Sequence, residues 1–255
     1  TACGGSGPVT SAHVTGSARR QPARFLFLYA LAYAGGVVAY TPFLILVLPA
    51  RVTELAGAED IRWLGYIVFA GAVAASVSGI LSGWLSDRTR SRRIWVAAGL
   101  AATIIAQLAM AKCETITALL WAVVVWQVAL NLMLVPLLAW AGDRVPDDQK
   151  GMLGGLLSIA PPLGALSGIV LPAGDAAFDI RLAIIAAMTA AMVLPLLLLA
   201  DRQQAPPLTI QPTPGDALHA RLAAQRIGMW TARLLMQLSG AALAAYLYFW
   251  LRDID

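Results

Sequence analysis

The sequence predicts an all-α polytopic membrane protein, in which a bundle of six helices is followed by a seventh transmembrane helix. Apolar residues make up 59% of the chain and charged residues only 13%, whereas soluble domains carry roughly 25% charged residues. Seven apolar stretches also reach roughly 17 to 25 residues, the length of a helix that crosses the hydrocarbon layer. Because these stretches are continuous and do not alternate over about ten residues, they indicate helices and not barrel strands.

The predicted spans follow one another along the chain, separated by polar or charged loops. Their ranges are 25–48, 63–86, 94–110, 117–141, 152–172, 181–200 and 227–251. Residues 1–23 lack an apolar core and are expected to form a disordered cytoplasmic tail. The six-helix bundle occupies 24–200. The proline-rich segment 201–226 is expected to be a stiff cytoplasmic linker with a short amphipathic helix, and 227–255 carries the seventh span.

The distribution of Lys and Arg predicts a cytoplasmic amino terminus and a multi-pass protein of the cell membrane. With the amino terminus and the even-numbered loops on one side, twelve basic residues fall on that side and five on the other. Translocation disfavours Lys and Arg in short loops, so the richer side is expected to be cytoplasmic. The net charge of +4 is explained by this topology, and no nucleic-acid partner is expected.

A dense charged run joins the second and third predicted spans. It reads Gly83-Trp-Leu-Ser-Asp87-Arg88-Thr-Arg90-Ser-Arg92-Arg93. It resembles the loop signature of the major facilitator superfamily, in which a Gly, a small residue and an Asp-Arg pair close the second helix and basic residues open the third. Arg90 and Ser91 stand where the family has a Gly-Arg step. The sequence around Asp87 is also similar to that of the sugar-cation symporter branches.

The resemblance implies the amino-terminal half of a twelve-helix transporter, together with its seventh helix. Such a protein moves a small polar solute, such as a sugar, across the membrane by alternating access. Five further helices would complete it, so its expected partner is the missing carboxy-terminal half or, as an alternative, a second copy of the chain. The lipid bilayer, the solute and a coupling cation or proton are the other expected partners.

The charged run also suggests a latch that can be made and broken as helices move. A second Asp-Arg pair follows the fourth span, so we expect Asp87 to meet Arg144 and Arg88 to meet Asp143. The alternative is that the basic residues only set the orientation. The candidate latch residues are Gly83, Asp87, Arg88, Arg92, Arg93, Asp143 and Arg144.

Small residues recur every four positions on the second and fifth spans, which predicts close packing of another helix. The resemblance implies that these two helices meet the opposite half of the transporter. The alternative is that small residues are common in membrane helices in general. The candidate residues for contact between halves are Gly71, Ala75, Gly79, Gly164 and Gly168.

Polar side chains far from the ends of spans are candidates for the solute cavity, because burying them in lipid without a partner is costly. In the resembled family, helices one, four and seven line that cavity. The alternatives are packing for the tyrosines, interhelical hydrogen bonds for the amides, and snorkelling for the arginine. The candidates are Tyr33, Tyr40, Gln127, Asn131, Arg233 and Gln237.

The sequence offers little support for other chemistry. No Asp or Glu lies near the middle of a predicted span, so these spans supply no evident proton-carrying carboxylate. We find no metal-ligand spacing, no cofactor motif and no nucleophile with a base, and we expect neither a metal, a cofactor nor an enzyme activity. The alternative functions are a drug or metabolite-proton antiporter of the same superfamily, a seven-helix receptor or sensor, and a non-transporting scaffold.

Overall fold

The computed structural model describes residues 20–89, 91–172 and 177–200, together with Gly228, Thr231, Ala232 and Leu235. The chain divides into two compact units, Thr1–Leu208 and Thr209–Asp255. The described part of the first unit is all-helical and contains no strand. In the second unit, the four described residues are helical. The predicted linker, most of the predicted tail and the rest of the predicted seventh span lie outside the described residues.

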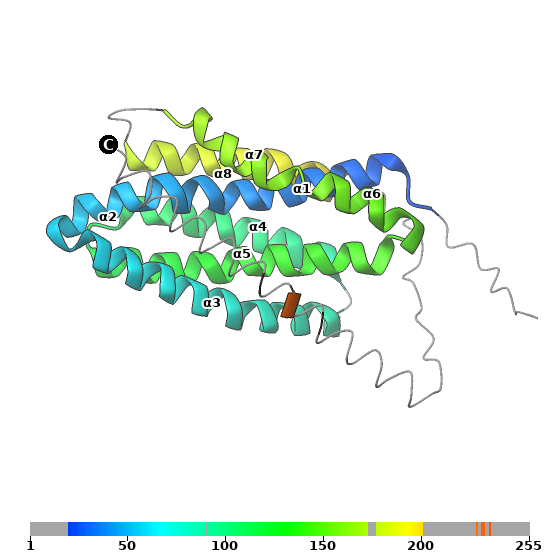
Figure 1. The fold of residues 1–255 in the computed structure, drawn as a ribbon, viewed down its shortest axis with the longest axis horizontal. Coiled ribbons are helices and arrows are strands. Elements are labelled where there is room, and N and C mark those ends of the chain that lie inside the picture. Colours follow the sequence, from blue (N-terminus) through cyan, green and yellow to red (C-terminus); the bar gives the residue numbers. More distant parts are fainter. Residues whose placement is uncertain are drawn as a thin grey trace, which may run out of the picture. The chain divides into compact units, whose positions relative to one another are not determined.

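The first third of the bundle is a helical run that reverses once (Figure 1). Helix α1 (Ala23–Pro42) continues through the π-helical turn η1 (Phe43–Val47) into α2 (Leu48–Ala56). The 3-10 turn η2 (Gly57–Glu59) then sends the chain back along α3 (Asp60–Thr89). Gly57 has a φ of 56°, a left-handed conformation that glycine adopts without steric cost.

The remaining helices run back and forth along the same bundle. Helix α4 (Arg92–Ala109) ends in the 3-10 turn η3 (Met110–Lys112), and α5 (Ile116–Arg144) returns. Pro136 lies inside α5, and Thr115 caps that helix by accepting a hydrogen bond from the Ala118 N–H. The last elements are α6 (Asp147–Leu157), α7 (Ala160–Ser167), the 3-10 turn η4 (Gly168–Val170) and α8 (Phe178–Leu199).

Five helical segments among the described residues are long and apolar enough to cross a membrane. They are Ala23–Thr89, Arg92–Lys112, Ile116–Arg144, Asp147–Val170 and Phe178–Leu199. The first contains the reversal at Gly57, so it supplies two arms, α1–α2 and α3. The described part of the first unit therefore has six helical arms, which coincide with the six spans expected within 24–200. A membrane location is compatible with these arms.

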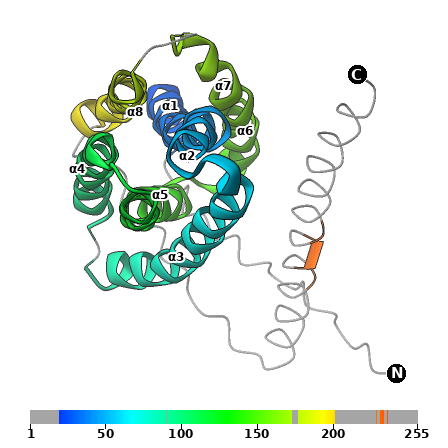
Figure 2. The same ribbon diagram turned by 90° about the vertical axis from the view of Figure 1, so that its left-hand side faces the viewer.

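The most extensive contacts between the arms correspond in pairs when the first three arms are exchanged with the last three. Helix α1 packs against α7 and α8, and in the same way α5 packs against α3 and α4. The contacts of α1 with α5 and of α4 with α8 map onto themselves, whereas those of α3 with α2 and with α4 have no counterpart of similar extent. The end-on view in Figure 2 shows α1 between α8 and α7, and α5 between α4 and α3.

Glycine permits close helix crossings at two corresponding places of this pattern. A Cβ atom on Gly99 of α4 would lie 2.3 Å from the backbone nitrogen of Met133 on α5. A Cβ atom on Gly35 of α1 would lie 2.8 Å from the Cβ of Met192 on α8. The crossings α4–α5 and α8–α1 correspond under the exchange of arms, and at both positions any side chain would force the helices apart.

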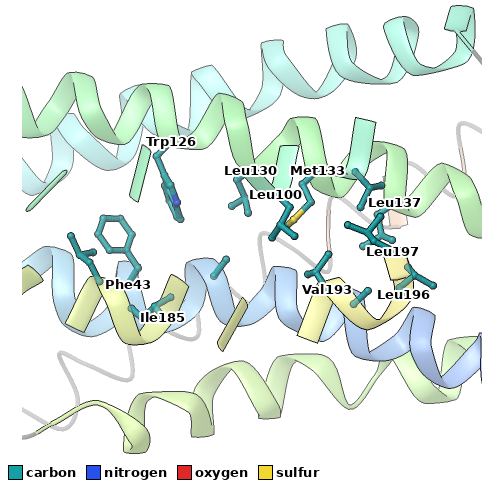
Figure 3. Close-up of a cluster of buried hydrophobic side chains, with 14 of the residues drawn as sticks. Phe43, Leu100, Trp126, Leu130, Met133, Leu137, Ile185, Val193, Leu196 and Leu197 are labelled. Atoms are coloured by element: carbon teal, nitrogen blue, oxygen red, sulfur yellow. The ribbon is translucent and has the colours of Figure 1, made fainter. Parts of the chain in front are cut away.

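The space between the arms is filled by apolar side chains (Figure 3). Phe43 on η1 and Trp126 on α5 are both fully buried, with ring centroids 4.7 Å apart and ring planes at 60°. Tyr29 on α1 is also fully buried, and its hydroxyl donates to the Leu137 carbonyl at 2.8 Å. Within a bilayer, the fit of such contacts and not the exclusion of water holds helices together.

Candidate functional site: an arginine latch between three helices

The two ends of the bundle carry different charged groups. At one end α3, α5 and α8 finish and α1, α4 and α6 begin, and we call this the Arg92 end. At the other end α2, η3 and η4 finish and α3, α5 and α8 begin, and we call this the Cys113 end. The predicted latch residues all belong to the Arg92 end.

Arg92 connects three helices at that end. Its Nε donates to Asp143 Oδ2 of α5 at 2.9 Å, and its Nη2 lies 2.5 Å from Asp87 Oδ1 of α3. Its Nη1 donates to the Ser86 hydroxyl at 2.6 Å. The first turn of α4 follows α3 after a short connection, which brings the guanidinium beside both carboxylates.

The three charged groups of this cluster differ in burial. The Arg92 side chain is only 15% exposed, whereas Asp87 is 64% and Asp143 is 42% exposed. A guanidinium with two directed hydrogen bonds and a further ion pair fixes the geometry of its partners. Because both carboxylates keep access to solvent, they can be released from Arg92 at a modest cost in free energy.

Asp87 and Asp143 are the two acids that the sequence predicted for the latch, and both carboxylates meet Arg92. The expected pairs of Asp87 with Arg144 and of Asp143 with Arg88 stay predictions. The guanidinium of Arg88 lies over the exposed ring of Trp84, 5.8 Å from its centroid. The sequence alone could not single out Arg92 as the shared partner, because four arginines follow Asp87 closely in the chain.

The other predicted latch residues have separate contacts. Arg93 donates from Nη2 to the Leu197 carbonyl near the end of α8. Gly83 faces α5, where an added Cβ would lie 3.5 Å from Val135 Cγ1. The Arg144 carbonyl accepts a hydrogen bond from Gln21.

The small-residue face of α3 packs within the bundle. An added Cβ at Gly71 would lie 3.4 Å from Gln127 Cγ of α5, and one at Gly79 would lie 3.7 Å from Asn131 Oδ1. Ala75 is partly buried between them. The buried hydroxyls of this face turn back to their own helix, since Ser78 donates to the Ala75 carbonyl at 3.3 Å. The face expected to meet an opposite half therefore meets α5.

The small-residue face of the fifth arm also packs inside the bundle. An added Cβ at Gly164 would lie 2.7 Å from Val37 Cγ1 and 2.9 Å from Thr41 Oγ1, both on α1. At Gly168 it would lie 2.7 Å from Leu46 Cδ1. Contact with α1 is thus sufficient to account for these glycines.

The four described cavity candidates face two different neighbours. Half-buried Tyr33 and Tyr40 pack beside Ala34, Val37 and Ala160, which lie on α1 and α7. The Gln127 and Asn131 side chains face α3, and Asn131 Nδ2 donates to the Gln127 carbonyl at 2.9 Å. The other two candidates, Arg233 and Gln237, lie outside the described residues.

A glutamine clasp at the Arg92 end was not predicted. The Gln21 backbone N–H donates to Gln149 Oε1 at 2.7 Å, and Gln149 Nε2 donates to the Gln21 carbonyl at 2.9 Å. Gln21 Nε2 also donates to the Arg144 carbonyl at 2.9 Å, and Gln21 is 5% exposed. Arg20 and Asp148 form an ion pair of 2.7 Å beside it. The only sequence signal was a glutamine near the start of each of two helices.

Arg51 forms a second junction of helices, at the Cys113 end. Its Nη2 donates to the Cys113 carbonyl at 2.9 Å, and its Nη1 lies 2.7 Å from Glu54 Oε2. The guanidinium also lies 5.1 Å from the centroid of Phe178 at the start of α8. Burial raises the pKa of the Cys113 thiol, and the positive charge of Arg51 partly offsets that rise.

No group of three or more His, Cys, Asp or Glu residues in the described part of the chain could hold a metal ion. Neither a protein-family model nor a curated protein matches this sequence.

Proposed function

We propose that the protein is a secondary active transporter of the major facilitator type, which moves a small polar solute across the membrane by alternating access. The observation that carries the proposal is the Arg92 latch, which binds the ends of α3 and α5 to the start of α4. A transporter must close one end of a bundle and reopen it in each cycle. A partly exposed ion-pair network is suited to that task, because it combines defined geometry with a low cost of release.

The exchange pattern of the arms supports the same proposal. In many transporter folds, repeated groups of helices pack around an internal axis, and movement of one group against another gives alternating access. Here the packing of α1 on α7 and α8 corresponds to that of α5 on α3 and α4. A receptor or a scaffold has no comparable need for a repeated three-arm unit.

The proposal includes a cytoplasmic Arg92 end and a complementary set of helices. Arg92, Arg88, Arg93 and Arg144 all lie at the end for which the positive-inside rule predicts the cytoplasm. The partner would be a carboxy-terminal half or a second copy of the chain. A cation or a proton would drive accumulation of the solute through groups outside the described spans.

Transport in proteoliposomes tests the proposal. The protein expressed from its complete gene would be reconstituted and offered a mixture of isotope-labelled sugars and amino acids, with uptake followed by mass spectrometry. We expect at least one compound to enter faster than into protein-free vesicles, and Arg92→Gln to slow its entry at least tenfold. Arg20→Gln is the matched control, because its ion pair lies at the same end and is largely exposed.

Two results would count against this function. Entry rates equal to those of protein-free vesicles, with folded protein in the membrane, would contradict transport itself. Equal uptake by the Arg92→Gln variant and the unaltered protein would contradict the latch as a part of the cycle.

A further inference from the structure

A glutamine in the interior of α4 has no hydrogen-bond partner. Gln107 is fully buried, and neither its Oε1 nor its Nε2 meets a polar group among the described residues. The other buried polar residue of α4, Thr103, is satisfied because its hydroxyl donates to the Gly99 carbonyl at 2.7 Å. An amide buried in apolar surroundings is strongly disfavoured unless something completes its hydrogen bonds.

A second unpaired polar group lies at the same level on the neighbouring helix. Trp126 of α5 is fully buried, and its Nε1–H has no acceptor in the described structure. The antiparallel helices α4 and α5 touch where Gly99 meets Met133. With a rise of about 1.5 Å per residue, Gln107 lies roughly 12 Å and Trp126 roughly 10 Å from that crossing, both toward the Cys113 end.

The only π-helical turn among the described residues occurs at this level. Phe43 begins η1 and packs edge-to-face on Trp126, with ring centroids 4.7 Å apart. In Figure 3, Phe43, Trp126 and Ile185 gather in one part of the interior, away from the group around Leu137. A π-helical turn widens a helix and is frequently found at functional sites.

We propose that Gln107 and Trp126 form a buried hydration site, in which an ordered water molecule bonds to both side chains. Trp126 Nε1 and Gln107 Nε2 donate hydrogen bonds, whereas Gln107 Oε1 accepts one. Water can accept two hydrogen bonds and donate two, so one molecule can bond to all three of these atoms. The polar groups that form the site are neutral, which favours a neutral occupant. Gln127 Oε1 is also unpaired, but that side chain faces α3 beside Gly71 and is not included.

Radiolytic labelling in ¹⁸O-water tests the site in the unaltered protein. Radicals formed from water oxidise side chains that touch water, so we expect ¹⁸O in the peptide that contains Trp126. Tyr29 is the internal control, because it is equally buried and its hydroxyl is paired with the Leu137 carbonyl. The proposal is supported if Trp126 incorporates at least five times as much ¹⁸O as Tyr29. Equal incorporation of ¹⁸O by Trp126 and Tyr29 would overturn it.

A double-mutant cycle tests whether one occupant links the two residues. We expect Gln107→Leu and Trp126→Phe each to lower the melting temperature, and the double variant to lose about as much as one single variant. Thr103→Val is the control on the same helix face, and its effect should add to that of Trp126→Phe. A rise in melting temperature for Gln107→Leu would show a dry, unpaired amide and would overturn the proposal. The cycle does not depend on transport activity.

Discussion

Arg92 at the start of α4 donates a hydrogen bond of 2.9 Å from Nε to Asp143 near the end of α5. The two residues are 51 positions apart in the sequence. The same guanidinium holds Asp87 of α3. One side chain thus joins the ends of α3 and α5 to the start of α4.

Arg92→Gln and Asp143→Asn are each expected to lower the free energy of unfolding by about 1 to 2 kcal/mol, because a charge-assisted hydrogen bond to a partly buried arginine is lost. The double variant should lose less than the sum of the two. Chemical denaturation in detergent measures all three. Arg88→Gln is the control, since that guanidinium lies on an exposed ring. Strict additivity would contradict the direct pairing of Arg92 with Asp143.

Gly99→Ala is expected to destabilise the bundle by about 2 kcal/mol or more, because the new methyl group would collide with the backbone of α5. The nearest atom would be 2.3 Å away. Gly65→Ala on α3 is the matched control, as nothing lies within 4 Å of its added Cβ. The higher helix propensity of alanine should make that variant about 0.5 to 1 kcal/mol more stable. Equal thermal stability of the two variants would refute the close crossing.

Gln21→Ala is expected to lower the free energy of unfolding by about 1 to 3 kcal/mol. The variant removes the hydrogen bond from the Gln21 side chain to the Arg144 carbonyl, and this bond helps to hold the segment that precedes α1. Arg20→Ala removes the adjacent exposed ion pair, and a loss of no more than about 1 kcal/mol is expected for it. Thermal unfolding of the two variants gives the comparison. A larger loss for Arg20→Ala would mean that the ion pair with Asp148 contributes more than the bond from the Gln21 side chain to the end of α5.

Cys113 is expected to react slowly with a membrane-impermeant maleimide at neutral pH. Burial raises the pKa of its thiol, so the reactive thiolate is scarce at neutral pH and increases only as the pH rises toward that pKa. The reaction rate should therefore keep rising beyond the pH at which an exposed thiol is fully ionised. The measurement uses a Cys3→Ser background, which leaves Cys113 as the single thiol.

The same reagent tests the orientation of the bundle. We expect Cys113 to react when the reagent is outside intact cells and to be protected in inside-out vesicles. Protection in cells and reaction in inverted vesicles would place the Arg92 end outside and would contradict the positive-inside assignment.

Apolar length and charge spacing were sufficient to predict much of the fold. The span predicted at 117–141 lies within α5 (Ile116–Arg144), and the span at 94–110 nearly coincides with α4 (Arg92–Ala109). Charged residues mark these boundaries, because each charged side chain would cost free energy in an apolar environment. The sequence reveals that cost one residue at a time. Gly57, where the chain reverses, lies between the spans predicted at 25–48 and 63–86.

Side-chain partners could not be predicted in the same way, because they depend on which helices become neighbours. The glycines at 71 and 164 indicated close packing, yet periodicity alone could not identify α5 and α1 as the partners. For the same reason the shared contact of Arg92 with Asp87 and Asp143 could not be predicted. The clasp between Gln21 and Gln149 joins residues 128 positions apart, and no local pattern marks such a pair.

The serine and glycine face of α3 has a mechanical consequence. Its buried hydroxyls at Ser78 and Ser86 bond to their own helix, and its glycines offer α5 no protruding groups. Side chains on such an interface do not interlock, so little resists an axial slip of one helix along the other. Arg92 donates a hydrogen bond to Ser86 and forms an ion pair with Asp87, and these contacts therefore fix the position of α3 along its axis.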